Sequence, residues 1–313
     1  MRAVVLDRFG SIENLQVKDL PIPEPGVGEV LVRIAAGSLN PIDVKTRTGQ
    51  GAANFAAIVP PIVLGWDLSG TVVACGAEAG DWRPGDAVFG SIGFPGLGRT
   101  NADYTVARAD HLARKPPPVT HEQAAAAAMA GQTAWQALTR HGRPAGGQKV
   151  LVQAASGGVG HMAVQIAKQF GADVTGTSSA SNRDFVLSLG ADTHIDYRNR
   201  PIETYPRDFD MVFDAVGGNT TLRSLALLKE DGLLVSILPP NDEIVAEEAV
   251  RTGRRFHFVL MQSSAADMTA VAHLLASGAI RPHVSQRFAL TDLGRAHALQ
   301  ETGRSVGKIV ILN

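Results

Sequence analysis

A glycine-rich turn follows a short apolar run in the middle of the chain. Residues 150–152 are all apolar and predict a buried strand, and the residues that come soon after them are Ser156, Gly157, Gly158, Val159 and Gly160. Two successive glycines let the backbone approach a pyrophosphate, and the last glycine lets the following helix pack closely on the strand. The N-terminus of that helix attracts anions. We therefore predict that residues 156–159 bind a dinucleotide, although Ala155 replaces the first glycine of the G-x-G-x-x-G pattern.

The end of the second predicted strand, 173–177, lacks the carboxylate that an NAD site places about 20 residues past the glycines. Ser178, Ser179 and Arg183 follow this strand, and Tyr197 follows the next one. Hydroxyl and guanidinium groups suit a 2′-phosphate, which a carboxylate would repel. The pattern favours NADP(H) over NAD(H). The alternative is that the serines cap a helix and that the arginine is merely solvated.

Strands and helices alternate in the sequence from Lys149 onward. Residues 159–170 carry apolar side chains three and four positions apart, which is the spacing of one helical face. Similar patterns predict strands at 173–177, 193–195, 211–213 and 233–238, and helices at 182–189 and 222–228. This order is typical of an α/β fold with a doubly wound parallel sheet, the Rossmann arrangement.

The first 120 residues contain short β-branched runs separated by turns, and Pro116-Pro117-Pro118 ends them. Thr120 and Gln123 then form a capping-box pattern at the start of an alanine-rich helix. The tail of the chain, with a strand at 308–312, resembles the first segment. We therefore expect residues 1–120 and 265–313 to form one β-rich substrate domain, and residues 121–264 to form the NADP-binding Rossmann domain.

The composition excludes several classes of protein. The chain has 313 residues, 45% of them hydrophobic, so it can bury more than one core. Its 29 basic and 30 acidic residues give a net charge of -1, which argues against nucleic-acid binding. A single cysteine excludes an intramolecular disulfide, and no run reaches the roughly 18 apolar residues of a membrane span. We expect a cytoplasmic protein that binds neither nucleic acid nor membrane.

The whole chain resembles a medium-chain dehydrogenase/reductase, in particular the zinc-free quinone oxidoreductase (zeta-crystallin-like) family. The resemblance implies a GroES-like fold for the β-rich domain. Besides the glycine turn, it rests on these segments: Asn40-Pro41-Ile42-Asp43, Gly65-Trp66-Asp67-Leu68-Ser69-Gly70, Pro84-Gly85-Asp86-Ala87-Val88-Phe89, Ala102-Asp103-Tyr104, Gly131-Gln132-Thr133-Ala134, Leu189-Gly190-Ala191-Asp192, Ile195-Asp196-Tyr197, Phe213-Asp214-Ala215-Val216-Gly217-Gly218 and Gly307-Lys308-Ile309-Val310.

The resemblance also implies that no metal takes part. Zinc-dependent relatives carry a cysteine where this chain has Asn40, and Gly-His-Glu where it has Gly65-Trp66-Asp67. The nine histidines are scattered and form no ligand motif. Without a Lewis acid to stabilise an alkoxide, hydride donation to an activated acceptor is the expected chemistry. A quinone or an α,β-unsaturated carbonyl is such an acceptor.

By the same resemblance, Asn40 and Asp43 are candidate catalytic residues with positioning roles. The nicotinamide would be bordered by Thr133, Val216, Leu238 and Phe258, and Lys308 would approach the nicotinamide or a phosphate. Each polar residue also has a purely structural interpretation: Asn40 opens a turn, Asp43 caps a helix and Lys308 lies on a strand surface. Many relatives have a tyrosine where this chain has Gly51, so no general acid is identified and water can supply the proton.

Two other functions stay open at this stage. One is an enoyl reductase acting on CoA- or carrier-linked substrates, for which Arg254 and Arg255 are the only basic pair. The other is an NADPH-binding sensor or structural protein without turnover. The apolar segment 255–260 resembles the edge strand through which members of this family pair, so a homodimer is expected.

Overall fold

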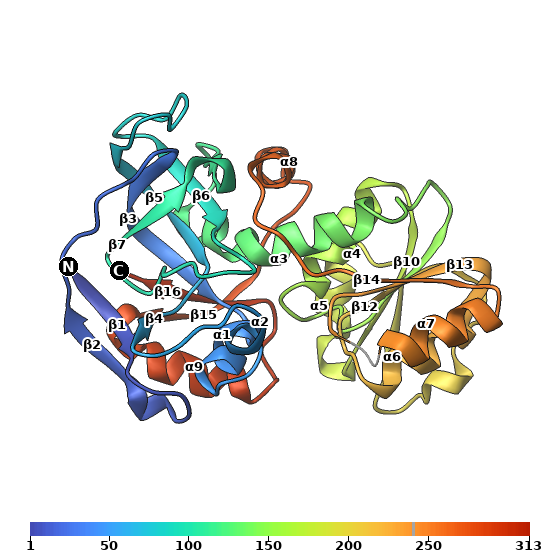
Figure 1. Ribbon diagram of the computed structural model, residues 1–313. Coiled ribbons are helices and arrows are strands. Elements are labelled where there is room, and N and C mark those ends of the chain that lie inside the picture. Colours follow the sequence, from blue (N-terminus) through green and yellow to red (C-terminus); the bar gives the residue numbers. More distant parts are fainter. Residues whose placement is uncertain (240–241) are drawn as a thin grey trace. The chain divides into compact units, whose positions relative to one another are not determined.

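The computed structural model describes residues 1–239 and 242–313, which divide into two compact units (Figure 1). Unit 1 contains Met1–Gln132 and Gln262–Asn313, and unit 2 contains Thr133–Met261. The sequence placed the divisions after residues 120 and 264 instead. The first division falls inside helix α3 (His121–Thr139), because the first part of this helix packs in unit 1. There its alanines lie against Ala36 and Val310, and the backbone N–H of Met129 donates to Asp67.

Unit 1 is built on β-sheets, as its β-branched runs predicted, and their pairings are antiparallel except for that of β15 with β16. A seven-stranded sheet has the order β15-β16-β3-β5-β6-β8, with β7 paired to β3, and a three-stranded sheet has the order β2-β1-β4. The strands are β1 (Arg2–Leu6), β2 (Leu15–Asp19), β3 (Glu29–Leu39), β4 (Ile62–Val63), β5 (Asp67–Cys75), β6 (Ala87–Ser91), β7 (Tyr104–Arg108), β8 (Ala113–Arg114), β15 (Val284–Ala289) and β16 (Lys308–Leu312). The tail strand β16 pairs antiparallel with β3, so the end of the chain completes this sheet.

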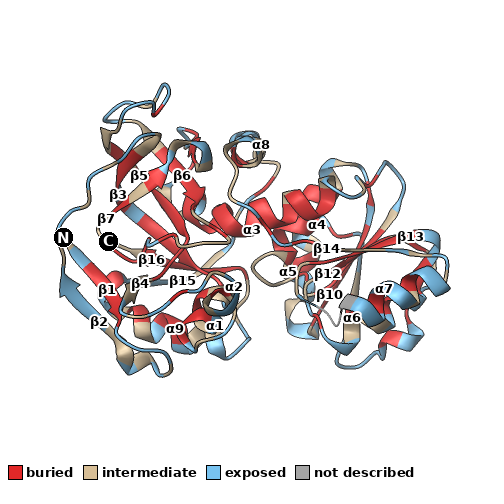
Figure 2. Cartoon of the chain, in the orientation of Figure 1, coloured by how far each residue is buried: buried red, intermediate tan, exposed pale blue. Residues whose placement is uncertain are grey.

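The helices of unit 1 are α1 (Pro41–Arg47), α2 (Ala52–Phe55), α8 (Ala265–Ala276), α9 (Leu293–Glu301) and the first part of α3. The capping box predicted for α3 is confirmed: the backbone N–H of Gln123 donates to Thr120 Oγ1 at 3.1 Å, and the backbone N–H of Thr120 donates to Gln123 Oε1 at 3.0 Å. The alanine run 124–128 is wholly buried, and Figure 2 shows α3 buried over most of its length. Small side chains let this helix approach its neighbours closely.

Unit 2 contains the predicted parallel sheet. Its strands are β9 (Lys149–Val152), β10 (Asp173–Ser178), β11 (Thr193–Asp196), β12 (Phe209–Asp214), β13 (Leu228–Ser236) and β14 (Arg255–Phe258), in the order β11-β10-β9-β12-β13-β14. All five pairings are parallel. From β9, the strands β10 and β11 extend the sheet to one side, and β12, β13 and β14 extend it to the other. This is the doubly wound order. Right-handed crossovers then place the helices of the two halves on opposite faces.

The helices of unit 2 are α4 (Gly160–Gln169), α5 (Arg183–Ser188), α6 (Asn219–Ser224) and α7 (Asp242–Arg251), with the second part of α3. The helix predicted at 222–228 was wrong in its position. α6 begins earlier, a short 3-10 turn covers Leu225–Leu227, and β13 already begins at Leu228. The spacing of the leucines in this segment fits one helical face. In the structure they lead into β13, and Leu225, Leu227 and Leu228 are buried in the core.

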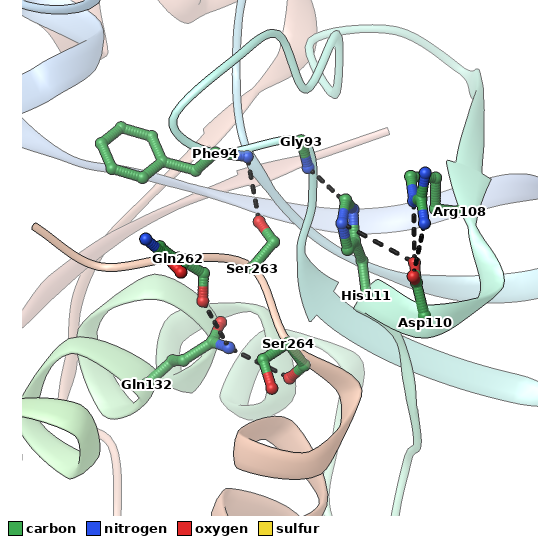
Figure 3. A network of polar contacts seen from close by, with 9 residues as sticks. All are labelled: Gly93, Phe94, Arg108, Asp110, His111, Gln132, Gln262, Ser263 and Ser264. Atoms are coloured by element: carbon green, nitrogen blue, oxygen red, sulfur yellow. Dashed lines mark hydrogen bonds and ion pairs between the residues drawn. The ribbon is translucent and has the colours of Figure 1, made fainter. Parts of the chain in front are cut away.

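The chain returns to unit 1 at Gln262, and hydrogen bonds hold the segment 262–264 to Gln132 and Phe94 (Figure 3). Gln132 Nε2 donates to the backbone oxygens of Gln262 at 3.2 Å and Ser264 at 3.0 Å. Phe94 and Ser263 exchange two bonds, and the backbone N–H of Gly93 donates to His111 Nδ1 at 3.1 Å. The backbone of the glycine-rich loop at 90–98 is therefore tied to the 3-10 turn at His111 and to Ser263 just before α8, and Figure 3 shows both of these anchors.

Candidate functional site

One edge of the unit 2 sheet carries most of the residues predicted to contact a dinucleotide. Because its strands are parallel, their carboxyl ends share an edge, and ligands of open α/β sheets bind beyond that edge. The predicted residues follow successive strands: Ser156, Gly157, Gly158 and Val159 after β9, Ser178 and Ser179 at the end of β10, Tyr197 after β11, Val216 after β12, Leu238 after β13, and Phe258 at the end of β14. The topology thus brings together residues that are far apart in the sequence.

The glycine turn after β9 has the tight geometry that a pyrophosphate site requires. A Cβ atom on Gly160 would lie 2.1 Å from the carbonyl oxygen of Ala154, so only glycine lets α4 begin directly against the turn. His161 Nδ1 lies 2.8 Å from the carbonyl oxygen of Gly157 and helps to hold the turn. Gly157 and Gly158 are partly exposed. The turn therefore fits the phosphates of a dinucleotide at the N-terminus of α4.

The structure separates the two serines at the end of β10. Ser178 is buried, and its Oγ lies 2.8 Å from His194 Nε2 and donates to the carbonyl oxygen of Ser179 at 3.1 Å. Ser179 is partly exposed, and its Oγ lies 3.0 Å from Ser181 Oγ. Neither serine caps a helix, because neither the 3-10 turn nor α5 has a side-chain cap. Ser179 is thus the serine that a bound ligand can reach directly.

Two further predicted residues are open to solvent beside Ser179. The side chain of Arg183 is 61% exposed and has only a 3.3 Å contact with Asp184. Tyr197 is 54% exposed, and the guanidinium of Arg198, which the sequence analysis did not consider, lies 5.9 Å from its ring centroid. These hydroxyl and guanidinium groups form a patch suited to a phosphate dianion.

A carboxylate that the sequence analysis overlooked lies next to this patch. Asp196 pairs in register with Ser178, because β10 and β11 are parallel neighbours. Its Oδ1 accepts the backbone N–H of Arg198 at 3.1 Å, and its Oδ2 accepts Asn199 Nδ2 at 2.5 Å. Both oxygens thus stabilise the turn after β11.

Asp214 fixes the turn that carries Val216. It is fully buried, and its Oδ1 accepts the backbone N–H groups of Val216 at 2.8 Å and Gly217 at 3.0 Å. Its Oδ2 accepts the hydroxyls of Thr221 and Ser236. Val216 is consequently presented at the sheet edge with 49% of its surface exposed, while Leu238 and Phe258 are half-buried. Thr133, in contrast, is buried in α3.

Unit 1 gathers a buried polar cluster around Asn40. Lys308 Nζ donates to Asn40 Oδ1 at 2.5 Å and to the carbonyl oxygen of Leu39 at 2.8 Å. Asn40 Nδ2 donates to Asp67 Oδ2 at 2.8 Å, and Lys308 Nζ lies 3.7 Å from the same oxygen. Lys308 was expected to approach a nicotinamide or a phosphate, but its ammonium group is 2% exposed and bonded within unit 1. Asn40 keeps one amide hydrogen with no acceptor among the described residues.

The two carboxyl groups of this cluster differ in their partners. Asp67 accepts three hydrogen bonds, from Ser38 Oγ at 2.6 Å, Asn40 Nδ2 at 2.8 Å and the backbone N–H of Met129 at 2.9 Å. Asp43 Oδ2 accepts one, from the backbone of Asn40 at 2.9 Å, and its Oδ1 has no partner in the described part of the chain. Burial raises the pKa of Asp43 to about 7. Burial also raises the pKa of Asp67, whereas the charge of Lys308 lowers it. The negative charge therefore lies on Asp67, and Asp43 keeps its proton at pH values below its pKa of about 7.

Comparisons with known proteins agree with this geometry. Residues 26–117 match the alcohol dehydrogenase GroES-like domain, and residues 189–311 match the family described as zinc-binding dehydrogenase. The chain is 32% identical to the NADPH-dependent alkenal/one oxidoreductase, chloroplastic, of Arabidopsis thaliana, over 99% of this chain and 79% of that one. The chain belongs to the zinc-free quinone oxidoreductase family of the medium-chain dehydrogenases/reductases.

Solved structures of similar proteins share the whole fold. The quinone oxidoreductase of Coxiella burnetii superposes with a TM-score of 0.94 at 36% identity, covering 100% of this chain and 99% of that one. The Escherichia coli quinone oxidoreductase complexed with NADPH superposes with a TM-score of 0.87 at 27% identity, covering 100% of both chains. These likenesses establish the GroES-like and Rossmann domains expected from the sequence.

This quinone oxidoreductase family member departs from the zinc-dependent relatives at the ligand positions. In the part of the chain that the structure describes, no three or more His, Cys, Asp or Glu side chains form a group that could hold a metal ion. Asn40 and Asp67, which stand at two of those positions, are instead hydrogen-bonded to each other. Among the described residues, no helix is long and apolar enough to cross a membrane.

Gly51 stands where a side chain would be strained. The backbone there has a φ of +57°, which L side chains rarely adopt. A Cβ atom would lie 2.8 Å from Ile42 Cδ1 and 3.1 Å from Lys45 Cβ, so the Ile42 side chain would have to move. The local backbone therefore favours glycine at this position.

Proposed function

We propose that the chain catalyses the NADPH-dependent reduction of a quinone or an α,β-unsaturated carbonyl without zinc. The observation that carries this proposal is the edge of the unit 2 sheet. It combines the glycine turn with Ser179, Arg183 and Tyr197. The neighbouring carboxylate of Asp196 is bonded to its own turn, and that of Asp184 is exposed to solvent. The alkenal/one oxidoreductase and the NADPH-complexed quinone oxidoreductase support the proposal by their names.

We assign the dinucleotide to unit 2. The glycine turn at 156–159 holds the pyrophosphate, and Ser179, Arg183 and Tyr197 hold the 2′-phosphate. Val216, Leu238 and Phe258 supply apolar contacts to the nicotinamide side, with Thr133 behind them. When bound, NADPH supplies a hydride for the reduction.

We assign the acceptor to unit 1, at Asn40. The bonds from Lys308 and to Asp67 hold the amide in one plane, so its remaining N–H can donate to a carbonyl oxygen. Lys308 then acts through Asn40, not on the cofactor. Asp43 holds the backbone of Asn40 in place. Because Gly51 offers no phenol, we assign the proton taken up by the product to solvent.

The function is tested by following the loss of NADPH absorbance with a panel of quinones, enones and enoyl-CoA esters. Turnover with quinones or enones is the expected result. Tight NADPH binding without turnover of any acceptor would identify a sensor instead. An exclusive preference for enoyl-CoA would identify the carrier-linked reductase. Of the basic pair, Arg254 makes three bonds to backbone oxygens, whereas Arg255 is exposed and makes one, through Nε.

We further propose that the protein is a cytoplasmic homodimer. Strand β14 is at the edge of the unit 2 sheet, and its backbone can pair with a second copy. The single cysteine, Cys75, is free, as in proteins of a reducing compartment. Neither nucleic acid nor membrane is proposed as a partner, because the net charge is only -1.

A further inference from the structure

His194 stands in β11, directly beside the residues proposed to hold the 2′-phosphate, and has had no role so far. It pairs in register with Gly176 of β10, and its Nε2 reaches Ser178 Oγ at 2.8 Å. No pattern in the sequence indicates this contact, because it depends on the pairing of two strands. His194 is half-buried, while Ser178 is buried beneath the turn that follows β10.

Ser178 Oγ is the polar atom through which His194 acts on the turn. It lies 2.8 Å from His194 Nε2 and 3.1 Å from the carbonyl oxygen of Ser179. A hydroxyl both donates and accepts, so Ser178 can bond to either tautomer of the imidazole. Burial lowers the pKa of His194, Asp196 opposes this effect, and Arg183 lowers the pKa further.

The Ser178–His194 pair lies at the start of a series of polar contacts along the turn at 178–183. Ser178 holds the carbonyl of Ser179, and the Ser179 hydroxyl contacts that of Ser181. Asn182 Nδ2 then donates to Ser156 Oγ at 3.2 Å, which links this turn to the glycine turn. The next residue is Arg183, the first residue of α5. Loss of the hydrogen bond between Ser178 and His194 would release the turn that presents Ser179 and Arg183.

We propose that His194 is a specificity-determining residue, which selects a phosphorylated dinucleotide by holding Ser178 and thereby the turn at 178–183. This inference rests on the proposed NADPH-dependent function. His194 acts through Ser178 and is a positioning residue. A ribose 2′-phosphate needs the turn fixed so that hydroxyl and guanidinium groups converge on it, whereas a dinucleotide without that phosphate does not.

The test compares dissociation constants for NADPH and NADH, measured by fluorescence titration of the whole protein. The variants are His194→Val, which removes the imidazole nitrogen bonded to Ser178, and His194→Gln, whose amide offers a polar group at a similar reach. Ser178→Ala removes the hydroxyl, and Thr193→Val changes the exposed neighbour on the same strand as a control. Thermal unfolding of each variant verifies that it is folded.

We expect His194→Val and Ser178→Ala each to weaken NADPH binding by about 5- to 10-fold, the value of one lost hydrogen bond, with NADH binding changed less than about 2-fold. His194→Gln should restore most of the NADPH affinity, and Thr193→Val should change neither. The double variant, His194→Val with Ser178→Ala, should bind NADPH no more weakly than the single variant of lower affinity, because both substitutions break the same bond.

Three outcomes would overturn the inference. Equal weakening of NADPH and NADH binding would show a general structural role, and unchanged dissociation constants for both in His194→Val would show no role. If the unsubstituted protein binds NADPH and NADH equally, the 2′-phosphate site of the proposed function fails as well. The last outcome is seen before any variant is made, so the failure of the proposed site is distinguishable from the failure of His194.

Discussion

At the scale of single residues, hydrogen-bond partners decide which carboxyl group in the Asn40 cluster is charged. Asp67 accepts three hydrogen bonds and lies 3.7 Å from the Lys308 ammonium, whereas Asp43 accepts one. A buried charge is tolerated only where it is paired and hydrogen-bonded. The cluster is therefore close to neutral when Asp43 keeps its proton, and removal of that proton should be costly.

This difference predicts a pH-dependent stability that Asp43→Asn removes. The pKa of Asp43 is about 7 in the folded protein and near 3.8 in the unfolded chain, so the folded state binds the extra proton between these values. The free energy of unfolding should then fall as pH rises from about 4 to about 7, and level off above that. The total loss is on the order of 4 kcal/mol.

Urea unfolding across this pH range measures the effect. Asp43→Asn should flatten the slope, since an amide does not titrate. Asp184→Asn, at a side chain that is 96% exposed, is the matched control and should leave the slope as it is. Identical slopes for Asp43→Asn and the unsubstituted protein would contradict the assignment of the proton to Asp43.

Arg183 provides a second prediction at this scale. A charge-assisted bond to phosphate is worth about 1.5–3 kcal/mol, so Arg183→Ala should raise the NADPH dissociation constant at least about 10-fold and leave that of NADH nearly unchanged. Arg251→Ala, at another exposed arginine of unit 2, controls for the loss of positive charge. An equal effect of both substitutions would point to the overall charge of the unit.

The candidate site could be predicted from sequence only where it depends on local pattern. Ser179, Arg183 and Tyr197 were predicted because a Rossmann unit places its ribose contacts after the second and third strands, and their roles stay predictions. His194 and Asp196 were missed because their neighbours are set by strand register, which the sequence does not show. Lys308 was expected at the cofactor, but its strand turns the ammonium toward Asn40, and only the sheet pairing reveals this.

At the scale of elements, the start of α4 depends on one missing side chain. Gly160 meets the backbone oxygen of Ala154, which cannot move as a flexible side chain can. Gly160→Ala should therefore destabilise the protein by about 1–3 kcal/mol and strongly reduce NADPH binding, because the turn must open.

Gly146→Ala is the matched control, since a Cβ at that position meets nothing within 4 Å. Calorimetric unfolding and fluorescence titration measure both effects. If Gly160→Ala binds NADPH as tightly as Gly146→Ala does, close packing of α4 on the turn is not what forms the phosphate site.

Elements with strong periodicity were predicted well and amphipathic surface helices less so. The parallel strands and α4 followed from short apolar runs and from one helical face. Helix α7 was not predicted, because its sequence is rich in acidic residues and much of its surface is exposed. The helix at 222–228 was displaced, because buried leucines satisfy a helix pattern and a strand pattern equally well.

At the scale of the whole molecule, the edge strand β14 predicts association. Light scattering should give a mass about twice 32.9 kDa. Leu260, just beyond β14, is 40% exposed, so Leu260→Asp should halve this mass without unfolding the chain.

The control for this test is Val250→Asp on α7, which makes the same kind of change at a residue that is 81% exposed. It should leave the mass as it is. A mass near 32.9 kDa for the unsubstituted protein would remove the dimer proposal.

The pairing of β16 with β3 also orders events during synthesis. Lys308 follows Leu39 by 269 residues, so a nascent chain makes Asn40 long before it makes the ammonium group that holds its amide. Unit 2 is one uninterrupted segment and can be completed while β3 still waits for its neighbour. A ribosome stalled ahead of the final strand should thus carry a polypeptide able to capture dinucleotide yet unable to reduce anything.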